Sequence, residues 1–215
     1  MAVNNSERAL MIFVRNPVQG KVKTRLARTI GEKKALAIYN DLLKYTFNST
    51  RDANCHKVVF YSDFVDRNDT WDENVFHKKV QSGRDLGERM KNAFRVMLDK
   101  GFKKVIIIGS DCPEINPALI DNAFGMLDYT GVVIGPAIDG GYYLLGLKQM
   151  CDALFEKKSW STSRLLNETI GELKKRSTPF SLLPELYDVD EEKDLNRKCP
   201  VWHDNPGFVS MSALK

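Results

Sequence analysis

Three basic residues lie within five positions of one another near the start of the chain, directly after a strand-like segment. The apolar run 9–14 has the length and branching of a buried strand, and it stops before Pro17. Lys21, Lys23 and Arg25 follow, immediately before a helical pattern begins. Backbone N–H groups at a helix start and cationic side chains are the groups with which proteins bind phosphate. This segment therefore predicts a phosphate-binding loop.

The positive charge of the chain is concentrated in the same region. Residues 15–34 contain seven basic residues and one acidic residue, a local excess larger than the net charge of +4 of the whole chain. The alternative interpretation is a solvent-exposed, basic helix start. The position directly after a strand favours binding, because open α/β sheets bind ligands at the carboxyl ends of their strands.

Acidic residues follow two other extended segments and could bind a metal ion. Asp111 comes closely after the apolar strand pattern 105–109, and Asp188 and Asp190 come after the extended segment 180–187. Carboxylate oxygens suit Mg²⁺ or Mn²⁺, and either ion could bridge phosphate oxygens held by the basic loop. We therefore expect Asp111 and one or both of Asp188 and Asp190 to share one divalent cation. The alternatives are a turn aspartate and an acidic helix N-terminus.

Two glycine-containing segments are further candidates for ligand contacts. Asp139, Gly140 and Gly141 separate two strand patterns, so the glycines leave room for a ligand and the carboxylate could activate an acceptor hydroxyl. A hairpin turn is the alternative, since Asp-Gly is a strong hairpin signal. Gly83 and Arg84 open a helical pattern and could contact the same ligand, although a plain helix start explains them equally well.

Length and composition narrow the class of protein. A chain of 215 residues with 43% hydrophobic and 28% charged residues suits one α/β domain, with a core over 8–198 and a tail over 199–215. The 32 basic residues are balanced by 28 acidic ones, which argues against a nucleic-acid partner. No segment has the length of a membrane span or the pattern of a signal peptide. The four cysteines are far apart, as expected for reduced thiols in the cytoplasm.

Strand and helix patterns alternate along most of the chain, which predicts a mostly parallel sheet covered by helices on both faces. Strands are expected at 9–14, 57–62, 75–81, 105–109, 131–136 and 142–147, with an extended segment over 180–189. Helices are expected at 25–51 with a break near Gly31, and at 85–100, 117–128, 162–176 and 191–197.

Six motifs, taken in order, resemble a bacterial family of nucleotide-diphospho-sugar transferase-like proteins: PVQGKVKTRLA, GRDLGERM, IIIGSDCP, GPAIDGGYYLLGL, WST and DVDEEKDL. The family is often labelled glycosyltransferase and is related to the guanylyltransferases of molybdopterin and deazaflavin cofactor assembly. The resemblance covers residues 10–196. It implies a GT-A type fold, which is a Rossmann-like three-layer α/β sandwich with a mostly parallel central sheet.

The same resemblance implies roles for individual residues. Lys21, Lys23 and Arg25 fall in its phosphate-binding loop, and Asp111 and Asp190 match its metal-binding acidic positions. The chain departs from the family pattern in two respects. SDCP has one carboxylate where many glycosyltransferases of this fold have Asp-x-Asp, and the glycine-rich loop of nucleotidyltransferases is reduced to a single glycine.

Three functions remain open on the sequence alone. The first is transfer of a sugar from a nucleotide diphosphate sugar to a small-molecule acceptor, with Asp139 orienting or deprotonating the acceptor. The second is nucleotidyl transfer, in which a phosphorylated acceptor attacks an NTP and pyrophosphate leaves. The third is a non-catalytic nucleotide-binding module. The family label favours the first, and the crowded basic loop favours the second.

Overall fold

A computed structural model describes residues 7–197, and its centre is one seven-stranded sheet. The strands lie in the order β3-β2-β1-β4-β6-β5-β7, and all neighbouring pairs are parallel except the two that involve β6. Their bounds are β1 Arg8–Val14, β2 His56–Tyr61, β3 His77–Val80, β4 Lys104–Ile108, β5 Val132–Pro136, β6 Tyr142–Leu147 and β7 Phe180–Leu182.

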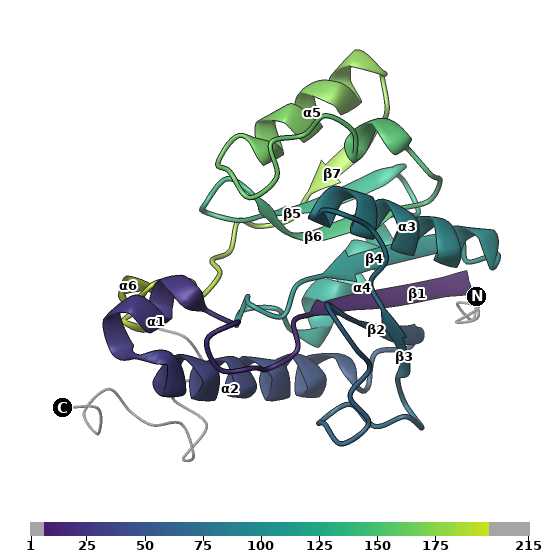
Figure 1. Ribbon diagram of the computed structural model, residues 1–215. Coiled ribbons are helices and arrows are strands. Elements are labelled where there is room, and N and C mark those ends of the chain that lie inside the picture. Colours follow the sequence, from purple (N-terminus) through teal and green to yellow (C-terminus); the bar gives the residue numbers. More distant parts are fainter. Residues whose placement is uncertain (1–6, 198–215) are drawn as a thin grey trace.

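Helices cover both faces of this sheet, as Figure 1 shows. Apolar side chains of α2 and α4 pack on one face, and those of α3 and α5 pack on the other. The helices are α1 Thr24–Ile30, α2 Glu32–Thr50, α3 Leu86–Asp99, α4 Pro117–Met126, α5 Leu165–Lys175 and α6 Glu192–Leu195, with a 3₁₀ turn at Asp152–Leu154. The predicted α/β sandwich with a mostly parallel sheet is therefore confirmed.

The alternation of side chains along β1 explains why two cores form. Leu10 and Ile12 belong to the cluster with α2 and α4, whereas Ala9 and Met11 belong to the cluster with α3. All four side chains are fully buried, because successive residues of a strand point to opposite faces and both faces are covered. The central strands are thus fixed from both sides, and their carboxyl ends form a rigid edge.

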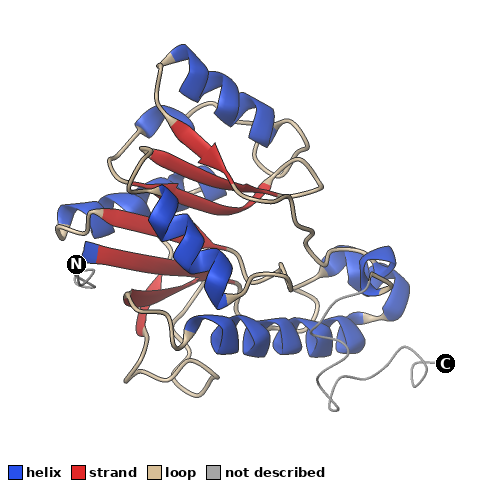
Figure 2. Cartoon of the chain, turned by 180° about the vertical axis from the view of Figure 1, so that it is seen from behind, coloured by secondary structure: helices blue, strands red, loops and turns tan. Residues whose placement is uncertain are grey.

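A third apolar cluster lies beyond that edge of the sheet. Residues of α1 and α2 pack there against Tyr187, Val189 and Leu195, which come from the far end of the chain. Both views show α1 and α6 beside each other, away from the strand ends (Figure 1, Figure 2). The cluster therefore holds the last described segment against the loop that follows β1.

Most expected elements are present, with small shifts at their ends. Gly31, whose φ is 86°, divides the expected first helix into α1 and α2. Asp85 and Asn116 accept hydrogen bonds from the backbone N–H groups of Glu88 and Leu119 and so cap α3 and α4. The sequence did not predict the orientation of β6, which runs antiparallel between β4 and β5. The expected tail over 199–215 lies outside the described residues. No described helix is both long and apolar enough to cross a membrane.

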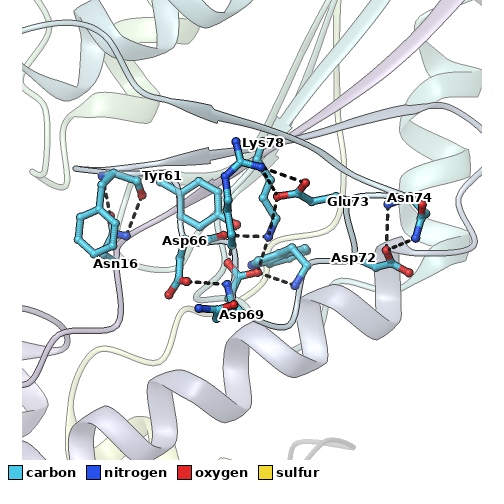
Figure 3. A network of polar contacts seen from close by, with 12 residues as sticks. Asn16, Tyr61, Asp66, Asp69, Asp72, Glu73, Asn74 and Lys78 are labelled. Carbon is cyan, nitrogen blue, oxygen red and sulfur yellow. Dashed lines mark hydrogen bonds and ion pairs between the residues drawn. The ribbon is translucent and has the colours of Figure 1, made fainter.

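The long connection between β2 and β3 is held by a polar network (Figure 3). The ammonium of Lys78 is buried and donates to a carboxylate oxygen of Asp69 and to the carbonyl of Asp66, both at 2.8 Å. The hydroxyl of Tyr61 donates to the other oxygen of Asp69. At the start of this connection, the buried Asn16 amide bonds to the backbone of residues 63 and 64. The network fixes this connection beside the carboxyl end of β1.

One helical glycine has a packing role that can be tested directly. A Cβ at Gly87 would lie 2.2 Å from Nε1 of Trp160, so the Gly87→Ala variant must displace the indole ring. We expect it to lower the free energy of unfolding by roughly 1–3 kcal/mol, as overpacking does. In the control Gly171→Ala, the new Cβ meets no atom within 4 Å, and we expect a gain of about 0.5–1 kcal/mol from helix propensity. Denaturant unfolding measures both; equal effects of the two variants would contradict the prediction.

Candidate functional site

The predicted phosphate-binding loop leaves the carboxyl end of β1 and enters α1 through Lys23. Two backbone hydrogen bonds between residues close in sequence shape this loop. The amide of Val18 donates to the carbonyl of Asn16, and the amide of Lys21 donates to the carbonyl of Val18. Lys23 has φ 47° and ψ 45°, the left-handed conformation, which is uncommon for a lysine. Such conformations cost free energy and persist where the surrounding contacts determine them.

Those contacts are ion pairs to two carboxylates. The ammonium of Lys23 lies 2.9 Å from Oδ1 of Asp111 and 3.2 Å from Oδ1 of Asp190, and only 4% of its side chain is exposed. Arg25 adds a weaker contact, with Nη1 3.8 Å from Oδ2 of Asp190. The expected proximity of Asp111 and Asp190 is therefore confirmed, although 79 positions separate them in the sequence. Lys21, in contrast, is exposed to solvent.

The path of the chain after β7 explains how Asp190 reaches β4. The segment first follows β5, with backbone bonds from Leu183 to Ile134 and from Leu186 to Pro136. It then crosses to the end of β4, where the amide of Val189 donates to the carbonyl of Asp111 at 3.0 Å. This bond joins the two acidic segments directly.

The start of α6 fixes the backbone on the other side of Asp190. The buried carboxylate of Asp194 accepts hydrogen bonds from the amides of Asp190 and Glu191 at 3.1 and 2.8 Å. The side chain of Glu191 accepts from the backbone of Asp194 in return, which completes a capping box. The acidic segment 190–194 therefore serves in part to start α6, and the carboxylate of Asp190 is left free to face Lys23.

Lys23, Asp111, Asp188 and Asp190 are ionisable groups that lie close together, and their proximity shifts the pKa of two of them, Asp188 and Lys23. Burial, followed by the negative charge of Asp111, raises the pKa of Asp188 to about 8. The charges of Asp139 and Asp190 raise it further, whereas Lys23 lowers it. Burial alone would lower the pKa of Lys23, but the carboxylates of Asp111 and Asp190 outweigh this effect and raise it. A further cation bound beside these carboxylates would favour the ionised form of Asp188.

The carboxylate oxygens at this site suit a divalent cation whose coordination is completed by the bound ligand and water rather than by further protein side chains. Among residues 7–197, no group of three or more His, Cys, Asp or Glu side chains forms a metal cage. Asp111 and Asp190 are both 43% exposed and offer carboxylate oxygens to one point. Mg²⁺ is commonly bound in this way, by one or two carboxylates together with substrate phosphates and water.

A buried tyrosine of α2 connects the strand ends at this site. The hydroxyl of Tyr39, on α2, accepts a hydrogen bond from the amide of Arg15 at 2.8 Å and donates to the carbonyl of Arg15 at 3.1 Å. It lies 3.3 Å from Oγ of Ser110, the residue before Asp111. No sequence signal pointed to these polar partners.

The turn between β5 and β6 is a hairpin, as the alternative interpretation predicted. Asp139 accepts a hydrogen bond from the amide of Gly141 at 2.8 Å and is exposed to solvent. Gly140 has φ 86°, and a Cβ there would lie 2.3 Å from the carbonyl oxygen of Ser163. The glycine therefore permits close approach of the 160–164 segment. Asp139 remains near enough to the acidic cluster to affect the pKa of Asp188.

Gly83 and Arg84 are occupied by contacts with the start of α3. Gly83 has φ 145°, and a Cβ there would lie 2.7 Å from the amide nitrogen of Arg89. The guanidinium of Arg84 pairs with Glu88 at 3.0 Å while 92% of the side chain is exposed. Nearby, the side-chain amide of Gln81 donates to the carbonyls of Val14 and Phe60, so this segment also lies at the carboxyl edge of the sheet.

A known family matches more than half of the chain. Residues 46–162, which are more than half of the chain, match the DUF2064 family, described as an uncharacterized protein conserved in bacteria. The chain belongs to the DUF2064 family. No curated protein matches the sequence.

Solved structures extend the comparison to nearly the whole length of this DUF2064 protein. A protein from Desulfovibrio desulfuricans G20, provisionally named a nucleotide-diphospho-sugar transferase, is 30% identical, with a TM-score of 0.83 over 97% of this chain and 94% of that chain. The expected resemblance to nucleotide-diphospho-sugar transferase-like proteins is therefore confirmed.

Two more distant structures share the fold. The inositol-1-phosphate CTP transferase from T. maritima is 16% identical, with a TM-score of 0.55 over 99% of this chain and 97% of that chain. The 4-diphosphocytidyl-2C-methyl-D-erythritol synthase from Anaerococcus prevotii DSM 20548 is 11% identical, with a TM-score of 0.56 over 89% of this chain and 93% of that chain. The neighbours are transferases, in agreement with the expected class of enzyme.

Removing the Tyr39 hydroxyl tests how strongly the strand ends depend on it. In Tyr39→Phe the amide and the carbonyl of Arg15 lose a buried partner. We expect the free energy of unfolding to fall by about 1–3 kcal/mol, the cost of unsatisfied buried polar groups. The matched control is Tyr129→Phe, whose ring is 89% exposed and which should unfold like the wild type. Unchanged stability of Tyr39→Phe would show that the hydroxyl has no structural role.

Proposed function

We propose that this DUF2064 protein is a metal-dependent transferase that acts on a nucleotide-activated substrate, transferring a sugar from a nucleotide diphosphate sugar to a small-molecule acceptor. The observation that supports this proposal most strongly is the cluster of Lys23 and Arg25 with Asp111 and Asp190 at the carboxyl ends of the central strands. It combines cations for phosphate with hard oxygen ligands for a divalent ion. The name and 30% identity of the Desulfovibrio protein support the same reaction class.

Cations of the loop bind the diphosphate in this proposal. Lys21 and Arg25 are exposed and available to a ligand, while Lys23 lies between the loop and the carboxylates. Positive side chains at this place stabilise the charge that develops on the departing diphosphate. An arginine can contact two phosphate oxygens at once, which also orients the group.

Asp111 and Asp190 would hold Mg²⁺ or Mn²⁺ in the same site. When bound, the ion neutralises phosphate charge and stabilises the leaving group. Asp188 is partly buried and comes two positions before Asp190, and a cation bound nearby would favour its ionised form.

Asp139 is the proposed catalytic residue on the acceptor side. Its turn follows β5, whose carboxyl end lies at the same edge of the sheet as those of β1 and β4. The exposed carboxylate can orient or deprotonate an acceptor hydroxyl there. Gly141 leaves the adjacent backbone open, since only the Asp139 side chain lies within 4 Å of its Cβ position. We assign Gly83, Arg84 and Gly140 to the margin of the ligand site.

Nucleotidyl transfer is the second candidate, and the charge of the loop favours it. Lys21, Lys23 and Arg25 lie within five positions of one another, and a triphosphate brings more charge to neutralise than a diphosphate does. In that reaction a phosphate of the acceptor attacks the α-phosphate, and pyrophosphate leaves. The same residues would bind the nucleotide in both reactions.

A panel of NTPs and nucleotide sugars separates these reactions. The purified protein is incubated with each compound, a set of small sugar and phosphate acceptors, and Mg²⁺ or Mn²⁺. Release of free NDP identifies glycosyl transfer, and release of pyrophosphate identifies nucleotidyl transfer. Binding without either product identifies a nucleotide-binding module and would contradict the proposed enzyme.

The metal ligands give a prediction on binding. Asp111→Asn and Asp190→Asn should each abolish the Mg²⁺-dependent part of nucleotide binding, because a neutral amide is a poor ligand for this ion. Calorimetric titration of the nucleotide with and without Mg²⁺ measures the effect. Asp99→Asn, an exposed change in the last residue of α3, is the control and should bind like the wild type. Full Mg²⁺ dependence in either variant would remove that carboxylate from the metal site.

Asp139 gives a prediction on turnover. Asp139→Asn should leave nucleotide affinity nearly unchanged and lower kcat by roughly 10²–10⁴-fold, the usual contribution of a general base. The turn itself should persist, since an asparagine side chain can accept the same bond from the amide of Gly141. Loss of nucleotide binding would instead indicate a metal ligand. Unchanged turnover would limit Asp139 to its part in the hairpin.

A further inference from the structure

The ammonium of Lys23 lies where a cation shared by Asp111 and Asp190 would bind. It contacts one oxygen of each carboxylate, at 2.9 and 3.2 Å. A divalent ion held by the same two carboxylates would bring a second positive charge close to the ammonium. Two positive charges at short range repel each other strongly. The lysine and a divalent ion would therefore compete for these two carboxylates.

The three side chains differ in solvent exposure, and this difference would allow an ion from solvent to replace the ammonium of Lys23 at the carboxylates. The Lys23 side chain is only 4% exposed, whereas both carboxylates are 43% exposed. An ion from solvent can thus reach the carboxylates without passing the lysine. The backbone of Lys23 is left-handed, with φ 47°, and its side chain reaches both carboxylates from this conformation.

We propose that Lys23 is a built-in competitor of the divalent cation: it pairs with Asp111 and Asp190 in the metal-free protein and is displaced by the ion. The displaced ammonium is then free to contact a phosphate of the nucleotide. The inference rests on the proposed function for the identity of the ion and the ligand. It adds that metal and nucleotide strengthen each other's binding, because each favours the arrangement in which Lys23 has left the carboxylates.

The affinity for Mn²⁺ in the absence of nucleotide tests the competition. Lys23→Met removes the ammonium and keeps a side chain of similar length, so we expect it to bind Mn²⁺ about tenfold or more tightly than the wild type. Lys23→Gln should behave in the same way and covers the case in which the first variant does not fold. The control Arg28→Met removes an exposed charge from the same helix and should change the affinity much less. Equal or weaker binding by both Lys23 variants would overturn the proposal.

Chemical labelling follows the displacement in the wild-type protein. The rate of reductive methylation at Lys23 and at the exposed Lys21 is measured by peptide mass spectrometry, with and without Mn²⁺. We expect the ion to increase the rate at Lys23 several-fold and to leave the rate at Lys21 nearly unchanged. A rate at Lys23 that Mn²⁺ leaves unchanged or lowers would contradict the exchange.

Different variants test the metal site and the competition by Lys23, so the failure of one proposal can be distinguished from the failure of the other. Loss of Mn²⁺ binding in Asp111→Asn supports the metal site whatever the Lys23 variants do. A Lys23→Met variant that binds Mn²⁺ no better than the wild type overturns the competition and leaves the metal site standing. If the wild type, Lys23→Met and Lys23→Gln all bind no Mn²⁺, both the competition and the metal site are wrong.

Discussion

The pairing of one buried ammonium with two carboxylates is the interaction on which the site depends. Lys23 belongs to the loop after β1, Asp111 to the loop after the middle strand β4, and Asp190 to the last described segment. Each of these groups would be costly to place here without the others, because a partly buried charge needs a partner. The interaction thus ties three distant segments to one point at the carboxyl edge of the sheet.

The rest of the structure can be understood as support for that point. Buried β1 and β4 bring the first two segments side by side, and the Tyr39 hydroxyl links their ends. The apolar cluster of α1, α2 and Val189 holds the third segment nearby, and the bond from Val189 to Asp111 sets its register. Apolar packing supplies most of the stability in this arrangement, and the polar contacts determine where the charged groups lie.

Much of this organisation was predictable from periodicity. The runs that form β1 and β4 are apolar after their first residue, which is typical of strands buried on both faces, and the acidic and basic segments come after strands. The ion pairs of Lys23 were not predictable, because they depend on a left-handed backbone at a non-glycine residue and on a crossing of the chain after β7. The packing of Gly140 against Ser163 was also hidden, since a glycine in a turn looks the same whether it faces a ligand or another loop.

The antiparallel strand β6 separates the carboxyl ends of β4 and β5 by a fixed distance along the sheet. It lies between β4 and β5, so the strands that lead to Asp111 and to Asp139 are second neighbours. With about 4.7–4.9 Å between adjacent strands, their ends are roughly 10 Å apart along the sheet. Backbone hydrogen bonds set this span, so side-chain substitutions can change the chemistry at either end but not the reach between them. In the proposed function, a substrate that contacts both Asp111 and Asp139 would have to span the separation that the sheet sets between these two strands.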